Sequence, residues 1–210
     1  MDQLREFVKT GRASETVQRT TALLEEGTEA EAIMNQALIP AMDEVGDLFQ
    51  KGEYFIPEML VAARAMQQGL EVLRPRLVEA GIDSLGKVVM GTVRGDLHDI
   101  GKNLVIMALE GAGFEVVDLG IDVVPDKFLE AVKAHRPLVV GISALLTTTM
   151  VAMKDTAEAI KASGIQTKIM IGGAPIRQEF ADEIGVDFYG PDSTSGRDFA
   201  RRVAIDNSQK

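Results

Sequence analysis

Residues 87–105 read KVVMGTVRGDLHDIGKNLV: an apolar run, a glycine-containing loop with one histidine, and then a stretch with helical periodicity. A short apolar run followed by a loop and a helix is typical of the first unit of a parallel α/β sheet. Further β-rich runs alternate with helical stretches at residues 114–120, 137–143, 168–173 and 186–190. Because each crossover must return over the sheet, the pattern predicts a five-stranded parallel sheet with helices on both faces, in the flavodoxin-like order 2-1-3-4-5.

The first part of the chain has a different period. From about Ser14 to Ala80, apolar residues recur every three or four positions, which predicts helices throughout. Glycines divide this run into four or five helices of a bundle; they are Gly27, Gly52 (with Pro57) and Gly69. The glycine-containing stretch 81–86 is typical of a linker. We therefore expect two domains, an all-α helical domain over 1–83 and a flavodoxin-like (Rossmann-like) α/β domain over 84–210.

Charge and composition narrow the classes of partner. The chain has 210 residues, a formal net charge of −10 and no cysteine. A negative surface repels nucleic acid, and no cluster of Lys and Arg stands out. No apolar run approaches the roughly 18 residues of a membrane span, and the N-terminus has no apolar signal core. We expect a cytoplasmic protein with neither nucleic acid nor membrane among its partners.

Three loops meet at one edge of the predicted sheet. GDLHDIG (95–101) follows the first strand, SALLTTT (143–149) the third and GGAP (172–175) the fourth. In open α/β sheets the ligand lies beyond the carboxyl ends of the strands, at the switch point between the first and third strands. Loops rich in Gly, Ser and Thr leave backbone groups and hydroxyls exposed there. The pattern predicts a site for a long, slender ligand group.

His98 is the unusual residue of these loops. The chain has one other histidine, His135, which we expect in a solvated position at a helix end. One imidazole and no thiolate cannot build a tetrahedral zinc site. A magnesium site of Asp96 and Asp99 would leave the histidine unused. A metal held in a macrocycle needs only one axial imidazole, which a nearby carboxylate can orient. An ordinary loop histidine is the competing interpretation, and the switch-point position disfavours it.

Two other functions of this fold lack their motifs. A phosphorelay receiver needs an aspartate at the end of the third strand, where this chain reads GISALL. A flavin or dinucleotide site needs a phosphate cradle such as G-x-G-x-x-G after the first strand. The glycines of GTVRGDLHDIG have other spacings, so neither function is supported.

The same loops carry three motifs of a known family. Residues 96–101 (DLHDIG) match the D-x-H-x-x-G motif of cobalamin-binding domains, Ser143-Ala144-Leu145 matches their S-x-L, and Gly172-Gly173 matches their G-G. Residues 46–66 resemble the helical cap module that precedes this domain in methionine synthase. Over nearly its whole length the chain resembles the small corrinoid proteins of methyltransferase systems for methanol, methylamines and methoxylated aromatics.

The resemblance implies a cobalamin or related corrinoid bound base-off and His-on. His98 would replace the cofactor's own lower base on cobalt, and Asp96 would hydrogen-bond to the other imidazole nitrogen. Gly101 would let the following helix start close to the corrin. Ser143 and Thr147 would bond to the nucleotide tail or the corrin. The full set of expected cofactor-binding residues is Gly95, Asp96, Leu97, Asp99, Gly101, Ser143, Leu145, Thr147, Gly172, Gly173 and Asp192.

The helical domain would act as a cap over the upper face of the corrin. Phe55, Met59 and Ala63 recur at i, i+4 and i+8, so they share one helical face and are the expected apolar cover. The same spacing is also typical of residues in a bundle core. The stretch 81–86 would be the hinge of this cap.

The implied function is that of a methyl-carrying corrinoid subunit, non-catalytic alone. A substrate-specific methyltransferase would load it, an acceptor methyltransferase would unload it to a thiol or a tetrahydrofolate-type pterin, and a reductive activator would restore it. A cobalamin-sensing regulator, a mutase small subunit and a passive cobalamin store are the alternatives. The sequence leaves open the methyl donor (methanol, methylamine or methoxyaromatic), the corrinoid's lower base and the oligomeric state.

Overall fold

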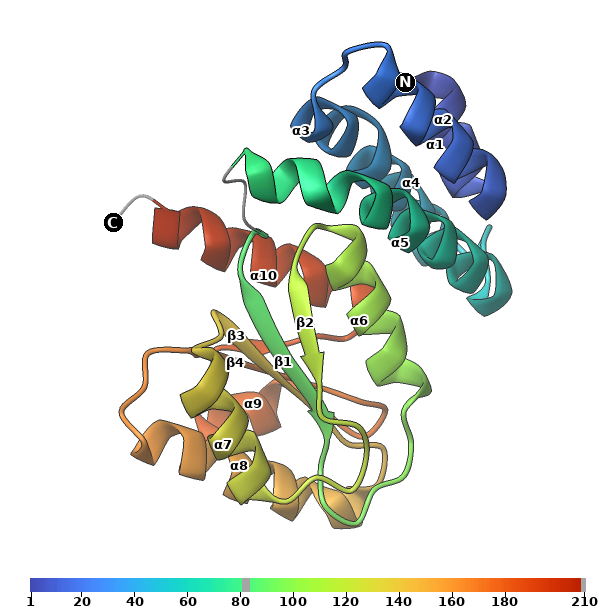
Figure 1. Ribbon diagram of the computed structural model, residues 1–210. Coiled ribbons are helices and arrows are strands. Elements are labelled where there is room, and N and C mark those ends of the chain that lie inside the picture. Colours follow the sequence, from blue (N-terminus) through green and yellow to red (C-terminus); the bar gives the residue numbers. More distant parts are fainter. Residues whose placement is uncertain (81–83, 209–210) are drawn as a thin grey trace. The chain divides into compact units, whose positions relative to one another are not determined.

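The computed structural model describes residues 1–80 and 84–208 (Figure 1). The chain divides into two compact units, residues 1–84 with 110–113, and residues 85–109 with 114–210. The predicted domain boundary follows residue 83, and the expected hinge spans residues 81–86. Residues 81–83, which include the last residue before that boundary and half of the hinge, lie outside the described residues. Both therefore stay predictions.

The N-terminal unit is all-α, as predicted. Its elements are α1 (Asp2–Lys9), α2 (Ala13–Glu25), α3 (Ala30–Ile33), the π-helical segment η1 (Met34–Leu38), α4 (Ile39–Gln50) and α5 (Ile56–Glu79). The sequence pattern missed α1, which precedes the periodic run. No helix among residues 1–80 and 84–208 is both long and apolar enough to span a membrane.

The helix break predicted at Gly69 is wrong. Gly69 lies inside α5, which continues through it. A Cβ at this position would lie 3.0 Å from Thr16 Cγ2 of α2 and 3.2 Å from Leu38 Cδ2. The glycine therefore lets α5 pack closely against its neighbours and does not end the helix.

The second unit contains the predicted sheet. Five parallel strands lie in the order β2-β1-β3-β4-β5, which confirms the predicted flavodoxin-like topology. They are β1 (Lys87–Thr92), β2 (Glu115–Asp118), β3 (Val139–Ser143), β4 (Lys168–Gly172) and β5 (Phe188–Tyr189). The register is continuous across the centre, where Val88 pairs with both Val116 and Val139. Because helices cover both faces, β1 reads as an almost unbroken apolar run.

The helices of this unit lie in two layers (Figure 1). α7 (Pro125–His135), α8 (Met150–Ala162) and α9 (Gln178–Ile184) share one core with the sheet. α6 (Ile100–Gly111) and α10 (Ser193–Ser208) cover the other face, and η2 (Thr147–Thr149) is a short 3₁₀ turn before α8. The fully buried ring of Phe128 from α7 lies over Gly91 of β1, where a Cβ would be 2.6 Å from Phe128 Cζ. Only a glycine in β1 admits this ring.

Gly91→Val tests that packing. We expect the free energy of unfolding of the α/β domain to fall by about 1–3 kcal/mol, because the new side chain overlaps a ring that has no room to move. Urea unfolding followed by circular dichroism measures the change.

Gly101→Ala is the matched control, because a Cβ there meets no atom within 4 Å. It should leave stability unchanged or raise it by up to about 1 kcal/mol, since Gly is a poor helix former. An unchanged urea midpoint in Gly91→Val would show that α7 does not pack on β1 in this way.

Candidate functional site

The loop after β1 is held by bonds to the neighbouring strand ends. The backbone N–H of Val93 donates to the Ser143 carbonyl at 3.0 Å, and Thr92 Oγ1 donates to the His98 carbonyl at 3.0 Å. Gly95 adopts φ +82°, in the left-handed region that favours glycine. Its N–H donates to Asp122 Oδ1 at 2.7 Å. The loop therefore turns sharply and returns its second half to the sheet edge.

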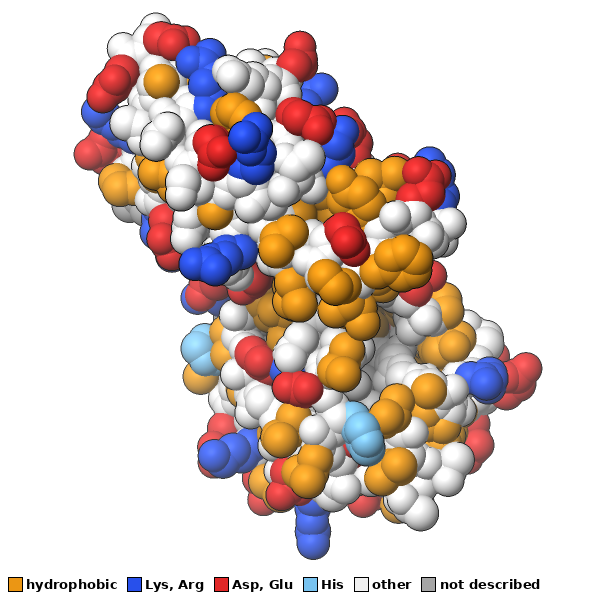
Figure 2. Space-filling model, turned by 90° about the vertical axis from the view of Figure 1, so that its right-hand side faces the viewer, with side chains coloured by type: hydrophobic (Ala, Val, Ile, Leu, Met, Phe, Trp, Pro, Cys, Tyr) orange, Lys and Arg blue, Asp and Glu red, His pale blue; other side chains and the backbone are white. Residues whose placement is uncertain are grey.

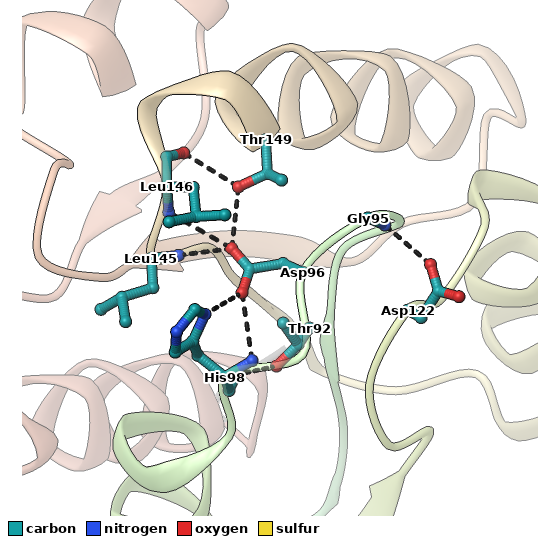
Figure 3. Close-up of polar contacts among 8 residues, drawn as sticks. All are labelled: Thr92, Gly95, Asp96, His98, Asp122, Leu145, Leu146 and Thr149. Carbon is teal, nitrogen blue, oxygen red and sulfur yellow. Dashed lines mark hydrogen bonds and ion pairs between the residues drawn. The ribbon is translucent and has the colours of Figure 1, made fainter.

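Asp96 is the centre of this loop, and its side chain is completely buried. Figure 3 shows its carboxylate between the His98 ring and the turn that follows β3. Oδ1 lies 2.8 Å from His98 Nδ1 and accepts the His98 N–H at 3.1 Å. Oδ2 accepts the N–H groups of Leu145 at 2.7 Å and Leu146 at 3.3 Å, and the Thr149 hydroxyl at 2.8 Å. One carboxylate thus ties the β1 loop to the β3 loop.

Those bonds keep Asp96 ionised. Burial alone would raise the pKa of this carboxyl, but hydrogen bonds from Leu145, Thr149 and His98 outweigh burial and hold the pKa far below its ordinary value. The site therefore carries a fixed negative charge beside the imidazole at neutral pH.

The ionised carboxylate decides which nitrogen of His98 carries the proton. Asp96 can only accept, so Nδ1 must donate, and Nε2 of the neutral ring is left with its lone pair. The side chain is 50% exposed, and Nε2 has no bonding partner within residues 1–80 and 84–208. This is the arrangement of a metal-binding histidine oriented by a carboxylate.

The hydroxyl that bonds to Asp96 belongs to Thr149, and not to Ser143 or Thr147, the two hydroxyl residues of the predicted set. Thr147 is exposed and Ser143 is partly buried, whereas the buried Thr149 reaches the carboxylate. Sequence analysis missed Thr149. The available signal was its position in the turn before α8, where side-chain hydroxyls commonly cap and bridge.

The two consecutive glycines are already required by the loops themselves. Gly173 adopts φ +134°, and a Cβ there would collide with the Ala144 carbonyl oxygen. A Cβ on Gly172 would lie 3.0 Å from the Gly190 carbonyl oxygen. Replacing either glycine would therefore disturb the backbone, whatever ligand lies beside it. Gly101 differs, because the space around it is open.

The two remaining polar residues of the predicted set bond to nearby groups. Asp99 Oδ2 accepts Asn103 Nδ2 at 3.1 Å, and Asp192 Oδ1 accepts the Ser195 N–H at 2.7 Å at the start of α10. Next to Asp192, the buried Ser193 Oγ has no hydrogen-bond partner in the part of the chain that the structure describes. An orphaned buried hydroxyl at the start of α10, after the loop that follows β5, suits a polar ligand group. Sequence analysis missed this residue.

The expected cover residues differ in exposure. Phe55 is 64% exposed, whereas Met59 and Ala63 are 1% and 6% exposed. A covering role stays a prediction for all three. For Met59 and Ala63 it would require side chains that are now buried to become accessible.

The donor set fits a metal that brings most of its own ligands. In residues 1–80 and 84–208, no group of three or more His, Asp or Glu could hold a bare metal ion. A single oriented imidazole fits an axial position, and exposed apolar side chains on the same loops suit the rim of a large ring; these are Leu97, Ile100, Leu145 and Leu146. Figure 2 shows hydrophobic side chains close to a pale-blue histidine at the protein surface.

Comparison with known proteins indicates a B12 (cobalamin) cofactor, as the sequence motifs implied. Two family models match, each described as a B12 binding domain, over residues 86–196 and residues 1–74. The chain is 43% identical over 183 residues to trimethylamine corrinoid protein 1 of Methanosarcina acetivorans, which is 85% of each chain. It is 43% identical over 165 residues to dimethylamine corrinoid protein 1 of the same organism, covering 77% of this chain and 78% of the relative.

A solved structure agrees over nearly the whole chain. It is the methanol:cobalamin methyltransferase complex of Methanosarcina barkeri, with a TM-score of 0.87 and 30% identity, over 96% of this chain and 78% of that chain. The two B12-binding family models, the identity to the methylamine relatives and the shared fold therefore agree. The chain belongs to the family of B12-binding corrinoid proteins that includes the trimethylamine and dimethylamine corrinoid proteins.

Proposed function

We propose that this protein carries methyl groups on the cobalt of a corrinoid bound base-off and His-on at the carboxyl edge of its sheet. When bound, the corrinoid supplies the metal that accepts and releases the methyl group. The observation that supports the His-on mode is the pair Asp96–His98: Nδ1 is held at 2.8 Å from an ionised carboxylate, and Nε2 meets no partner among the described residues. His98 would bind cobalt through Nε2.

Asp96 sets the properties of that ligand. It keeps the proton on Nδ1 and fixes the ring plane, and a carboxylate on the far nitrogen makes Nε2 a stronger donor. The bonds from Leu145 and Thr149 keep the carboxylate ionised while it does so. Ligand strength at His98 is therefore set by groups on a different loop.

The loops after β3, β4 and β5 would receive the nucleotide tail. Gly172 and Gly173 keep these loops close together, and Ser143 and Thr147 present hydroxyls at the same edge. Ser193 Oγ, which has no hydrogen-bond partner in residues 1–80 and 84–208, would gain a hydrogen bond from a polar group of the tail. The other expected contacts would border this space; they are Gly95, Leu97, Asp99, Gly101, Leu145 and Asp192.

The protein would not turn over alone. A substrate-specific methyltransferase would load it, an acceptor methyltransferase would unload it to a thiol or tetrahydrofolate-type acceptor, and a reductive activator would rescue oxidised cobalt. We propose methylamines as the methyl source. The identity of 43% to relatives named for trimethylamine and dimethylamine supports this choice.

His98→Ala tests the axial ligand. The variant should fold, because a half-exposed loop side chain is removed, but methylcobalamin bound to it should lack the His-dependent shift of the visible spectrum. His135→Ala removes the other histidine and should behave as the wild type. A shift that persists in His98→Ala would refute the assignment.

Asp96→Asn tests the buried carboxylate. The carboxylate accepts hydrogen bonds at both oxygens, whereas the amide has one acceptor oxygen and an NH₂ group in place of the other. Some of the donors that face Asp96 are therefore left without an acceptor. We expect stability to fall by about 1–3 kcal/mol at pH 7, and cobalamin affinity to fall about 10- to 100-fold.

The loss of stability should depend on pH. The pKa of Asp96 is lower in the folded state than the ordinary 3.8, so its ionised form stabilises the fold above that value, and this contribution is lost as pH falls toward the folded pKa. The difference in urea midpoint between wild type and Asp96→Asn should therefore shrink from pH 6 to pH 3. The exposed Asp155→Asn is the control. A difference independent of pH would contradict the argument.

Gly101→Ala and Gly101→Leu test the open space before α6. Neither Cβ meets a neighbour within 4 Å, so both proteins should fold. Cobalamin affinity should fall in steps, more for Leu than for Ala, because the side chain enters the space assigned to the corrin. Equal affinity of the wild type and Gly101→Leu, measured by equilibrium dialysis, would place the corrin elsewhere.

A further inference from the structure

Lys102 is a buried cation that the proposed function does not use. It is the third residue of α6, and its side chain is 1% exposed. Nζ donates to Asp118 Oδ1 and Oδ2, both at 2.7 Å, and to Asn103 Oδ1 at 2.8 Å. An ammonium has three N–H donors, and these contacts use them all.

The position is unfavourable for a lysine on stability grounds. Burial removes the ammonium from water, and the first turn of a helix repels positive charge. An apolar side chain of similar length often serves the stability of such a position equally well. What the lysine offers and an apolar residue does not is a directed link between two elements.

That link joins the start of α6 to the end of β2. Asp118 is the last residue of β2, and its Oδ1 also accepts the Gly120 N–H at 2.9 Å. The following loop also contacts the first half of the His98 loop. Gly95 N–H donates to Asp122 Oδ1 at 2.7 Å, and Asp122 N–H donates to the Asp96 carbonyl at 3.1 Å. His98 thus lies between two attachments to the same neighbouring segment.

Asn103 extends the attachment to the residue beside the histidine. Its Oδ1 accepts from Lys102, and its Nδ2 donates to Asp99 Oδ2 at 3.1 Å. The chain of contacts Asp118–Lys102–Asn103–Asp99 therefore ends one residue from His98. Asp96 orients the ring from one side, and this chain restrains the backbone on the other.

We propose that Lys102 is a positioning residue for His98, which holds the backbone after the histidine so that Nε2 stays aimed at the metal. The inference rests on the proposed function, since it assigns a role toward the same axial ligand. Without the link, the first turn of α6 keeps its helical bonds but loses its attachment to β2, and the histidine samples a wider range of directions.

Lys102→Met is the test, and Lys168→Met is the matched control. Lys168 forms a Lys–Asp pair of the same length, 2.7 Å to Asp187 Oδ1, at the start of β4, but on the surface, with its side chain 55% exposed. In the protein without cofactor, hydrogen exchange of residues 93–103 should speed up in Lys102→Met only. With methylcobalamin, the His-on share of the visible spectrum should fall and the dissociation constant should rise about 10-fold.

The outcomes separate this inference from the proposed function. Wild-type exchange and a wild-type His-on spectrum in Lys102→Met would overturn the inference and leave His98 as ligand. If the wild type itself shows no His-on spectrum, the proposed binding mode fails, and the exchange measurement alone decides whether Lys102 restrains the loop. Should Lys102→Met not fold, Lys102→Met/Asp118→Asn removes both charges, and the same two readouts decide on that variant.

Discussion

The buried carboxylate of Asp96 is the constraint around which the site is built. A charge without solvent contact is stable only if its oxygens are fully bonded, and here the bonds come from two loops that are 49 residues apart in sequence at Leu145. Satisfying the charge therefore brings the β1 and β3 loops together at the switch point of the sheet. The same carboxylate also orients His98, with the proton on Nδ1, which faces Asp96, and the lone pair on Nε2, which points outward.

The parts of the domain divide this work between them. The sheet and its two helix layers place the strand ends, and Gly91 and Gly173 permit the close approaches that this requires. Asp96 sets the imidazole, while Asp122 and Lys102 hold the loop on either side of it. The proposed cofactor would meet a ligand whose direction is already set, which lowers the cost of ordering it on binding.

The ion pair of Lys102 shows how stability and function can favour different residues. A buried lysine at the positive end of a helix is a poor choice for folding alone. The proposed role explains why a lysine stands there, because its bonds restrain the backbone next to His98. The hydroxyl of Ser193 has the same character, since no group in the described part of the chain bonds to this buried polar atom at the edge where a ligand is proposed.

The sequence by itself determined the fold class, the strand order and the loop that carries His98, because apolar periodicity and chain connectivity are local properties that few topologies can satisfy. The resemblance to the D-x-H-x-x-G motif also implied the contact of Asp96 with His98, which the structure has at 2.8 Å between Oδ1 and Nδ1. Tertiary structure alone decided that Thr149 and not Thr147 meets the carboxylate, that Lys102 pairs with Asp118, and that Gly69 serves packing. Each of these depends on which side chains of separate elements lie close together in space. The spacing of residues along the chain does not determine those distances.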